Sequence, residues 1–263
     1  MLELYHNAFS SCSQKVRIVL GEKGLDWKGH EIDLTGGGQH DPEYVKLNPN
    51  HVVPTLVHDG RVLIESTLIN EYLEDAFPTP SLRPSDPAAL HAMRLFVKQI
   101  DEKVHPAAGV VTYGIATRPM LLGRPPEDRE AAWANIPDPA RRAARKSVIE
   151  HGVAAPEMRG AIAAFIGMLD RMDGLLADRT WLAGDDFSLA DAAALPYVLR
   201  LEHLAMGDLI SARPRAADWF VRVQALGSYP AMVSDVLPEP IVAMFRRNAE
   251  EVKGELDALI SSL

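Results

Sequence analysis

The pattern of hydrophobic residues changes once along this chain of 263 residues, and the change falls at a cluster of prolines. Before the prolines, short alternating segments that indicate strands are interspersed with segments of helical spacing. After them strand signals nearly vanish, and helical spacing appears in residues 90–109, 158–177, 189–204 and 215–226. Because prolines interrupt regular structure, residues 80–88 are expected to link one domain of residues 1–79 to a second of residues 89–263.

The N-terminal region predicts the element order βαβαββα. Strands are expected at residues 2–6, 27–34, 55–58 and 61–64, and helices at residues 14–20, from Asp41 onward and at 66–77. Asp59-Gly60, between the last two strands, is a strong signal for a tight hairpin turn. This order is typical of a thioredoxin-like α/β domain, and the second domain is predicted to be an all-helical bundle. Residues 114–155, which are rich in proline and arginine, fit neither pattern.

The composition excludes several classes of protein and site. A net charge of −9 argues against a nucleic-acid partner, since such proteins usually present a basic surface. Cys12 is the only cysteine, which rules out an internal disulfide framework and a cysteine-rich metal site, and no metal is expected. The first residues lack the pattern of a secretory signal, and no apolar run is long enough to span a bilayer. The composition therefore predicts a soluble, cytoplasmic protein without a membrane partner.

A carboxylate followed by a hydroxyl, Glu65-Ser66, stands where the last predicted strand gives way to a helix. The carboxylate suits an ammonium group, while the hydroxyl and the N–H groups at a helix start suit a carboxylate. The pair can therefore bind both ends of an amino-acid head group, such as the γ-glutamyl group of glutathione. The alternative is a helix cap beside a surface acid, which would be the default without further motifs.

Further motifs surround this pair. They are Ser10-Ser11-Cys12-Ser13, Lys15-Val16-Arg17, Glu22-Lys23-Gly24, Asn48-Pro49, Val53-Pro54-Thr55-Leu56, Asp59-Gly60 and Glu71-Tyr72-Leu73. Each is weak alone, but in this order and spacing they resemble the N-terminal domain of the glutathione transferases. In the second domain, residues 187–191 resemble the capping box of the same family. The resemblance implies that glutathione is a co-substrate, that the partner substrate is a hydrophobic small-molecule electrophile, and that the protein is a homodimer.

Such an enzyme has to generate a thiolate, because a free thiol with a pKa of about 8.5 is mostly protonated at neutral pH. By resemblance to the zeta and theta classes, the run Ser10, Ser11 and Cys12 is the expected catalytic segment, with Ser10 as the hydroxyl that stabilises the thiolate. The alternative is that Ser10 only caps a helix. A redox role for Cys12 is disfavoured, because Ser10 and Ser13 occupy the first and fourth positions of a C-x-x-C-like turn.

The resemblance also assigns the glutathione-binding residues, which are His40, Val52, Val53, Pro54, Glu65 and Ser66. Glu65 would bind the γ-glutamyl ammonium and Ser66 its carboxylate. A cis bond before Pro54 would let Val53 pair with the cysteinyl backbone of glutathione. His40 and Gln39 are candidates for the glycyl carboxylate, and His51 competes with them. Many relatives carry Lys or Gln where this chain has Val52, so the glycyl end is expected to be held differently here.

Other candidates lie in the second domain. Tyr113, Arg118, Trp133, Tyr197 and Arg200 are candidates for the second-substrate pocket, although aromatic residues at helical spacing are more often part of a core. Ser188 and Asp191 are expected to form a reciprocal helix cap, and replacement of Asp191 should cost about 1 kcal/mol or more.

The subfamily is left open between two groups. The Ser10-Ser11-Cys12 run resembles the zeta class, which includes maleylacetoacetate isomerases. The longer second domain is more similar to the bacterial β-etherase-like and fungal-type transferases. The sequence thus predicts a glutathione transferase that attacks a hydrophobic electrophile, with an aryl ether as one candidate. The alternatives are a zeta-like isomerase and a glutathione-binding or regulatory protein without turnover.

Overall fold

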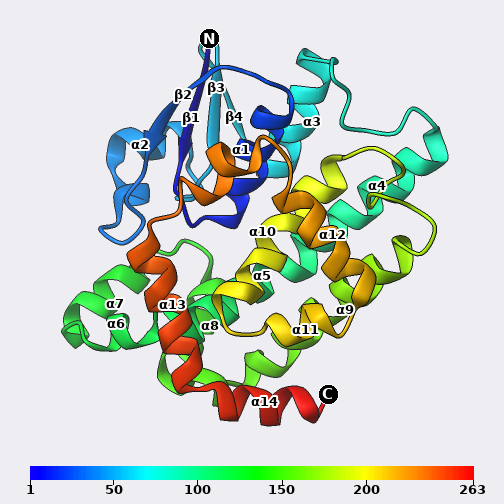
Figure 1. The fold of residues 1–263 in the computed structure, drawn as a ribbon. Coiled ribbons are helices and arrows are strands. Elements are labelled where there is room, and N and C mark those ends of the chain that lie inside the picture. The colour runs from blue at the N-terminus through cyan, green and yellow to red at the C-terminus, as the bar shows by residue number, and fades with distance from the viewer. The chain divides into compact units, whose positions relative to one another are not determined.

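The computed structural model describes residues 1–263 and contains one four-stranded sheet with the order β2-β1-β3-β4 (Figure 1). The strands are β1 (Leu2–His6), β2 (Trp27–Glu31), β3 (Thr55–His58) and β4 (Arg61–Ile64). Strand β1 pairs in parallel with β2 and antiparallel with β3, while β3 and β4 form the expected hairpin. Both hairpin-turn residues, Asp59 and Gly60, have positive φ, which explains the use of this dipeptide.

The helices of this region are α1 (Ser11–Glu22), the short η1 (Gly38–His40), α2 (Pro42–Leu47) and α3 (Ser66–Ala76). Helices α1 and α3 pack against each other (Figure 1). The predicted thioredoxin-like order is confirmed, with two differences in bounds. Helix α1 starts earlier than residue 14, because Ser10 caps it, and β2 ends before residue 34. The last backbone bond at this end of β2 runs from Ile32 N to His6 O at 2.7 Å.

Alternation in β1 places Leu2, Leu4 and His6 on the buried side. Leu4 is fully buried, and so are apolar residues of α1, β3 and α3, which are Val16, Val19, Leu20, Leu56, Ile69 and Leu73. Apolar positions three and four residues apart place one face of each helix in this core. The core therefore fixes where α1 and α3 begin relative to the sheet.

The remaining chain is helical, as predicted. Its elements are α4 (Pro87–Gln99), η2 (Ile100–Val104), α5 (His105–Val111), η3 (Thr112–Ala116), α6 (Arg118–Leu122), α7 (Pro126–Ala134), α8 (Pro139–His151), η4 (Gly152–Ala154), α9 (Pro156–Leu175), α10 (Leu189–His203), α11 (Gly207–Ser211), α12 (Pro214–Gln224), η5 (Pro230–Ser234), α13 (Glu239–Glu251) and α14 (Lys253–Ser261). The four segments with helical spacing coincide with helices. Residues 114–155, unplaced by the sequence, form the end of η3, then α6, α7, α8 and η4.

The chain divides into two compact units, neither of which is continuous in sequence. The sheet unit comprises Met1–Lys98, Leu175–Pro196 and Asp218–Pro238, and the helical unit comprises Gln99–Gly174, Tyr197–Ala217 and Glu239–Leu263. The sheet unit thus includes helical segments from the second half of the chain. The domain bounds of 1–79 and 89–263 stay a prediction.

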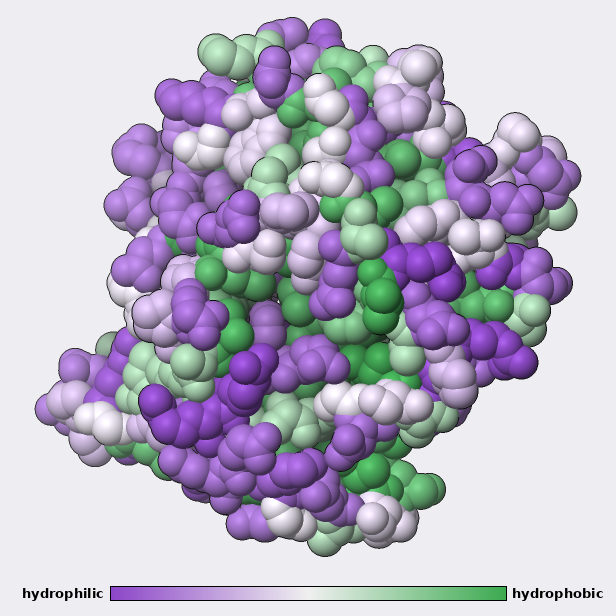
Figure 2. Space-filling view, viewed as in Figure 1, coloured by the Kyte–Doolittle hydropathy of each residue, from purple (hydrophilic) through white to green (hydrophobic).

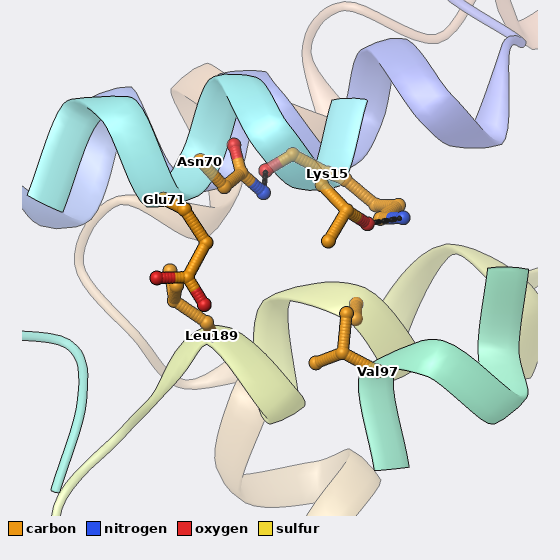
Figure 3. Close-up of a pocket in the computed structure, with 7 residues that line it drawn as sticks. Lys15, Asn70, Glu71, Val97 and Leu189 are labelled. Carbon is orange, nitrogen blue, oxygen red and sulfur yellow. Dashed lines mark hydrogen bonds between the residues drawn. The ribbon is translucent and has the colours of Figure 1, made fainter. Parts of the chain in front are cut away.

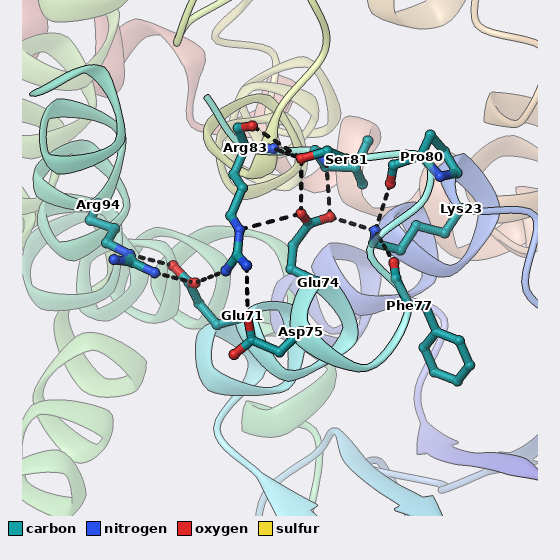
Figure 4. A network of polar contacts seen from close by, with 10 residues as sticks. Lys23, Glu71, Glu74, Asp75, Phe77, Pro80, Ser81, Arg83 and Arg94 are labelled. Atoms are coloured by element: carbon teal, nitrogen blue, oxygen red, sulfur yellow. Dashed lines mark hydrogen bonds and ion pairs between the residues drawn. The ribbon is translucent and has the colours of Figure 1, made fainter. Parts of the chain in front are cut away.

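A buried ion pair inside the sheet unit holds the start of the proline-rich segment (Figure 4). Lys23 Nζ lies 2.5 Å from Glu74 Oε1, and both side chains are at most 1% exposed. Lys23 also donates to the carbonyls of Phe77 and Pro80, at 2.8 and 2.7 Å. Glu74 accepts a bond from the N–H of Leu82 at 2.9 Å. The start of the expected linker is therefore held by directed bonds to α1 and α3.

A buried carboxylate, Asp191, organises the start of α10. Its Oδ2 accepts bonds from Ser188 N and Ser188 Oγ at 2.9 and 2.7 Å, and Ser188 Oγ accepts from Ala190 N at 3.2 Å. These are the bonds that a reciprocal cap requires. Asp191 Oδ1 accepts two more, from Leu182 N at 3.0 Å and Trp219 Nε1 at 2.7 Å. The aspartate therefore joins a helix start to the loop before it and to α12.

The face drawn in Figure 2 is covered mainly by hydrophilic residues. The large hydrophobic side chains that are exposed are Met1, Val62, Leu68, Leu95, Leu122, Val221, Ile241 and Leu263. No single helix is both long and apolar enough to cross a membrane, and only the pair 139–154 and 156–175, bent by 83°, meets the length and composition requirement jointly.

Replacement of Asp191 by alanine should destabilise the protein by about 3 kcal/mol or more, because several buried donors would lose their acceptor at once. This exceeds the effect of losing a simple cap. Chemical denaturation of D191A measures it, and D186A, which removes an exposed aspartate from the same segment, is the control. A loss for D191A no larger than that for D186A would contradict the assigned role.

Candidate active site

Ser10 lies at the N-cap of α1, at the end of the loop that follows β1. Its Oγ accepts a bond from Ser13 N at 3.2 Å. A hydroxyl has one donor in addition to its acceptor lone pairs, so this bond leaves the Ser10 proton available to a ligand. The side chain is half-buried. Capping and thiolate stabilisation are thus compatible roles for one hydroxyl.

The other two residues of the expected catalytic run lie in the first turn of α1. Ser11 is buried and Cys12 is half-buried. The neighbouring Ser13 is fully buried, and its hydroxyl accepts a bond from Asn7 N at 3.3 Å. The serines on either side of Ser11 and Cys12 therefore shape the loop and the helix start.

The loop from Asn7 to Ser10 is held from the β2 side by Glu31. One carboxylate oxygen of Glu31 accepts bonds from Ala8 N and Asn7 Nδ2, both at 3.1 Å. Asn7 Nδ2 also donates to Ile32 O at 3.0 Å, and Asn7 Oδ1 accepts from Phe9 N at 3.0 Å. The path of the chain up to Ser10 is consequently set by side chains outside the expected catalytic run.

The peptide bond between Val53 and Pro54 is cis, which confirms the prediction for this turn. Val53 is buried. The carbonyl of Val52 accepts bonds from Tyr44 Oη at 2.6 Å and from Asn48 Nδ2 at 2.9 Å. These two bonds hold the backbone of Val52 beside the cis-proline turn, whatever its side chain.

Glu65 and Ser66 form the junction between β4 and α3, as predicted. Glu65 occupies the N-cap position but makes no side-chain cap bond, and its φ of 69° lies in the left-handed region. Its exposed carboxylate accepts a bond from Asn50 Nδ2 at 3.4 Å. Ser66, the first residue of α3, is 7% exposed. The first N–H groups of α3 therefore remain available to an anion.

Gln39, His40 and His51 come together beside η1. His40 Nδ1 lies 2.9 Å from His51 Nδ1, and Gln39 Nε2 lies 3.0 Å from His40 Nε2. The two imidazole centroids are 5.2 Å apart. Residues that the sequence offered as competing candidates are therefore members of one polar cluster.

The candidates for the second-substrate pocket all lie in the helical unit, in two groups. Tyr113, Tyr197 and Arg200 belong to the first. Burial lowers the pKa of Arg200 to about 10, and the electrostatic influence of the two tyrosines opposes this shift. Arg200 also donates to Thr112 Oγ1 at 3.4 Å. Tyr113 carries the guanidinium of Arg145 over its ring, 3.0 Å from the centroid.

Arg118 and Trp133 form the second group, around the C-terminal half of α8. Arg118 donates to Ile149 O at 2.9 Å and to Glu150 O at 3.0 Å. Trp133 packs with Ile136 and Ile149 in a small apolar cluster. The contacts of Trp133 are those of a core residue.

A small cavity lies in the sheet unit between α1, α3, α4 and α10 (Figure 3). Lys15 on one wall is fully buried and donates to Thr67 Oγ1 at 2.8 Å, and the opposite side includes Val97 and Leu189. Its volume of about 10 Å³ is room for about one water molecule. The cavity is therefore too small for either substrate.

Family models match both parts of the chain. The model described as glutathione S-transferase, N-terminal domain, matches residues 4–81, and that described as glutathione S-transferase, C-terminal domain, matches residues 139–222. Tetrachloro-p-hydroquinone reductive dehalogenase of Sphingobium chlorophenolicum is 31% identical over 239 residues, covering 87% of this chain and 94% of that protein. The chain therefore belongs to the glutathione S-transferase family, and this membership implies the use of glutathione.

Two further relatives have names that indicate two different enzymes. Protein LigF of Sphingobium sp. SYK-6 is 30% identical over 236 residues, covering 85% of this chain and 90% of LigF. The crystal structure of this beta-etherase matches with a TM-score of 0.79 and 27% identity, covering 88% of this chain and 98% of that structure. Maleylacetoacetate isomerase of Pseudomonas aeruginosa is 30% identical over 218 residues, covering 81% of this chain and 87% of that protein.

Four residues without a role assigned from the sequence contact the loop before Ser10 or each other. They are His6, Asn7, Glu31 and Arg17, of which only Arg17 belongs to a motif. His6 is 7% exposed, and its Nδ1 lies 3.3 Å from Arg17 Nη1 and 3.4 Å from Glu31 Oε2. Burial lowers the pKa of His6 to about 4, with smaller contributions from Arg17 and His30. The imidazole is therefore neutral at pH 7, despite the nearby carboxylate.

This pKa predicts a pH dependence of stability. The folded protein holds His6 neutral down to pH about 4, whereas an unfolded histidine takes up a proton near pH 6.5. Between these values the unfolded state binds more protons, so the contribution of His6 is complete above pH 6.5 and is lost as the pH falls toward 4. Denaturant unfolding at several pH values should therefore show a shallower decline for H6Q than for the wild type. The exposed His91 provides the control H91Q, and a decline for H6Q as steep as that of H91Q would contradict the prediction.

Proposed function

We propose that this protein is a glutathione transferase in which Ser10 stabilises the thiolate of glutathione. The observation that carries the proposal is the geometry of Ser10, whose Oγ accepts from Ser13 N while its own proton stays available. The start of α1 adds favourable electrostatics, because the positive end of a helix dipole stabilises an anion. Both effects favour the thiolate over the thiol and so lower the thiol pKa.

The γ-glutamyl end of glutathione is assigned to Glu65 and Ser66. The Glu65 carboxylate is exposed and makes no cap bond, so it is available to an ammonium. Ser66 and the first N–H groups of α3 suit the carboxylate. The left-handed φ of 69° at Glu65 supports the assignment, since such strain in a non-glycine residue is concentrated at functional sites.

The remaining two parts of glutathione are assigned to the cis-proline turn and the polar cluster. Val53, before Pro54, would pair with the cysteinyl backbone. His40, Gln39 and His51 would bind the glycyl carboxylate as one cluster. Both nitrogens of His40 contact the other two members, so His51 Nε2 and the second amide N–H of Gln39 would be the donors. The short contact of 2.9 Å between His40 Nδ1 and His51 Nδ1 requires one of the two nitrogens to be the donor and the other the acceptor.

The second substrate is proposed to be an aryl ether. The thiolate sulfur would attack the ether-bearing carbon, a C–S bond would form, and the C–O bond would break. The phenolate would leave with the electron pair and take a proton from water. The match to LigF, a beta-etherase by the name of its structure, with a TM-score of 0.79, supports this class. An isomerisation of the maleylacetoacetate type is the second candidate, supported by a relative of that name at 30% identity.

Replacement of Ser10 by alanine should lower turnover by roughly 10- to 100-fold, because a hydrogen bond to a charged group contributes about 1.5 to 3 kcal/mol. Affinity for glutathione should change little, since Glu65 and Ser66 hold the other end. Steady-state kinetics with a panel of aryl ethers, aryl halides and a maleyl-type isomerisation substrate measures the first effect, and calorimetry measures the second.

The variants S11A and C12A separate the members of the expected catalytic run. A larger loss for S11A would transfer the role to Ser11, and abolition of activity by C12A would indicate thiol chemistry of the protein itself. If the wild type binds glutathione but turns over no substrate in the panel, it is a binding protein. Light scattering on the same samples tests the homodimer that the family resemblance implies.

The strained backbone at Glu65 predicts that two substitutions of this residue will affect glutathione binding alike and the stability of the unliganded protein differently. Both E65A and E65G should lose most of the thermal stabilisation that glutathione gives the wild type, which is about 2.7 kcal/mol at one hundred times Kd. Without glutathione, E65G should be more stable than E65A by about 1 kcal/mol, because only glycine adopts a left-handed backbone without steric cost. Equal stabilities of the two variants, or an undiminished glutathione shift in either, would contradict the role of Glu65.

A further inference from the structure

Arg17 is a charged residue in the interior of the sheet unit, where a charge is unfavourable without compensating bonds. It lies on α1 and is 0% exposed. Burial lowers its pKa to about 10, so it remains a cation at neutral pH. Placing a charge in such an environment is costly unless directed bonds compensate for lost hydration. The hydrogen-bond partners of its guanidinium therefore indicate the structural role of Arg17.

The guanidinium bonds mainly to backbone carbonyls. Nη1 donates to Asn7 O and Nη2 to Ala8 O, both at 3.1 Å, while Nε donates to Met232 O at 3.0 Å. Asn7 and Ala8 are consecutive residues of the loop that leads from β1 to Ser10. The planar, rigid fork of an arginine can fix two adjacent carbonyls at once, which a lysine ammonium cannot do with the same geometry.

One atom joins Arg17 to Ser10. The carbonyl oxygen of Asn7 accepts the bond from Arg17 Nη1 and also a bond from Ser10 N at 3.2 Å. Glu31 holds the same loop from its other side, through Ala8 N and Asn7 Nδ2. A shift of the Asn7 carbonyl would thus be passed directly to the backbone of Ser10, and with it to the Ser10 hydroxyl.

We infer that Arg17 is a positioning residue for the Ser10 hydroxyl, acting through the carbonyl of Asn7. The inference rests on the proposed function of Ser10. Arg17 itself does not touch glutathione in this scheme. It sets the place of the donor that faces the sulfur, and small displacements of such groups have large effects on rate. Its substitution should therefore change the thiol pKa and kcat, and leave binding of the γ-glutamyl end unchanged.

The test is a double-mutant cycle of R17K with S10A, in the full chain. The readouts are the pKa of the thiol of bound glutathione, from the pH dependence of thiolate absorbance, and kcat with KM for glutathione. In the Ser10 background, R17K should raise the thiol pKa and lower kcat by about tenfold, with KM changed less than about twofold. In the S10A background the same substitution should change neither readout appreciably. The variant R17Q, which keeps an N–H donor without the charge, is expected to behave like R17K.

A matched control is R222K. Arg222 also bonds to a backbone carbonyl in the sheet unit, that of Thr180 at 2.9 Å, and its substitution should leave the thiol pKa unchanged. Equal effects of R17K in the presence and absence of the Ser10 hydroxyl would overturn the inference, as would an unchanged thiol pKa in R17K. If neither Arg17 variant folds, Arg17 is a structural residue and the inference fails. If S10A alone leaves the thiol pKa unchanged, the proposed function of Ser10 fails instead, and the cycle distinguishes the two results.

Discussion

The turn from β1 into α1 is the constraint on which the proposed chemistry depends. Within four residues the chain leaves β1 and enters a helix with a hydroxyl at the N-cap. Backbone groups in so short a loop cannot bond to each other alone, and buried ones need partners. Gln14 supplies one through a bond to Ala8 O at 3.0 Å, and Arg17, Glu31 and Ser13 supply further ones. The loop is thus shaped by the side chain of Asn7 within it and by the side chains of Gln14, Arg17 and Glu31 outside it.

Buried charges serve the same purpose elsewhere in the sheet unit. Lys23 and Glu74 bond to backbone groups of residues 77–82, and Asp191 to those of residues 182 and 188. Several hydrogen bonds to one charged group define the position of a segment, because each bond requires a particular distance and direction. These charged groups therefore fix the segments that connect the elements of the unit, and the apolar core around Leu4 gives the unit its stability.

At Glu65, in contrast, the surrounding structure holds the backbone in an unfavourable conformation. A left-handed backbone costs a non-glycine residue about 1–2 kcal/mol. The hairpin of β3 and β4 before it and the packed helix α3 after it determine the path of the chain, so the junction has to accept that conformation. The result is an acidic side chain that does not cap its own helix and leaves the helix start available. Stability and the proposed binding of glutathione thus make opposing demands at this residue.

Much of the fold could be read from the sequence, because periodicity reports directly on local structure. Alternation and helical spacing gave the thioredoxin-like order, and Asp59-Gly60 gave the hairpin. The secondary structure of residues 114–155 could not be predicted from periodicity, for a physical reason. The π-helical turns η2 and η3 precede or open this region, and short proline-bounded helices follow, so no single period persists long enough to be recognised. The extent of β2 was overestimated because its apolar pattern continues beyond the last ladder bond.

Within the candidate site, the sequence by itself determined the residues that carry a motif, which are Ser10, the Val53-Pro54 turn and Glu65-Ser66. Their chemistry follows from residue type and from the strand or helix end on which they stand. Only the tertiary structure decided which charged residues are buried, and next to which backbone groups. The motif Lys15-Val16-Arg17 could not show that Arg17 is buried, because its partners in the loop after β1 and at Met232 are brought to it by the fold. The tertiary structure also brought Gln39 and His40 together with His51. Residues that are close in space need not be close in the chain, and a hydrogen bond forms only where the fold places its donor next to its acceptor.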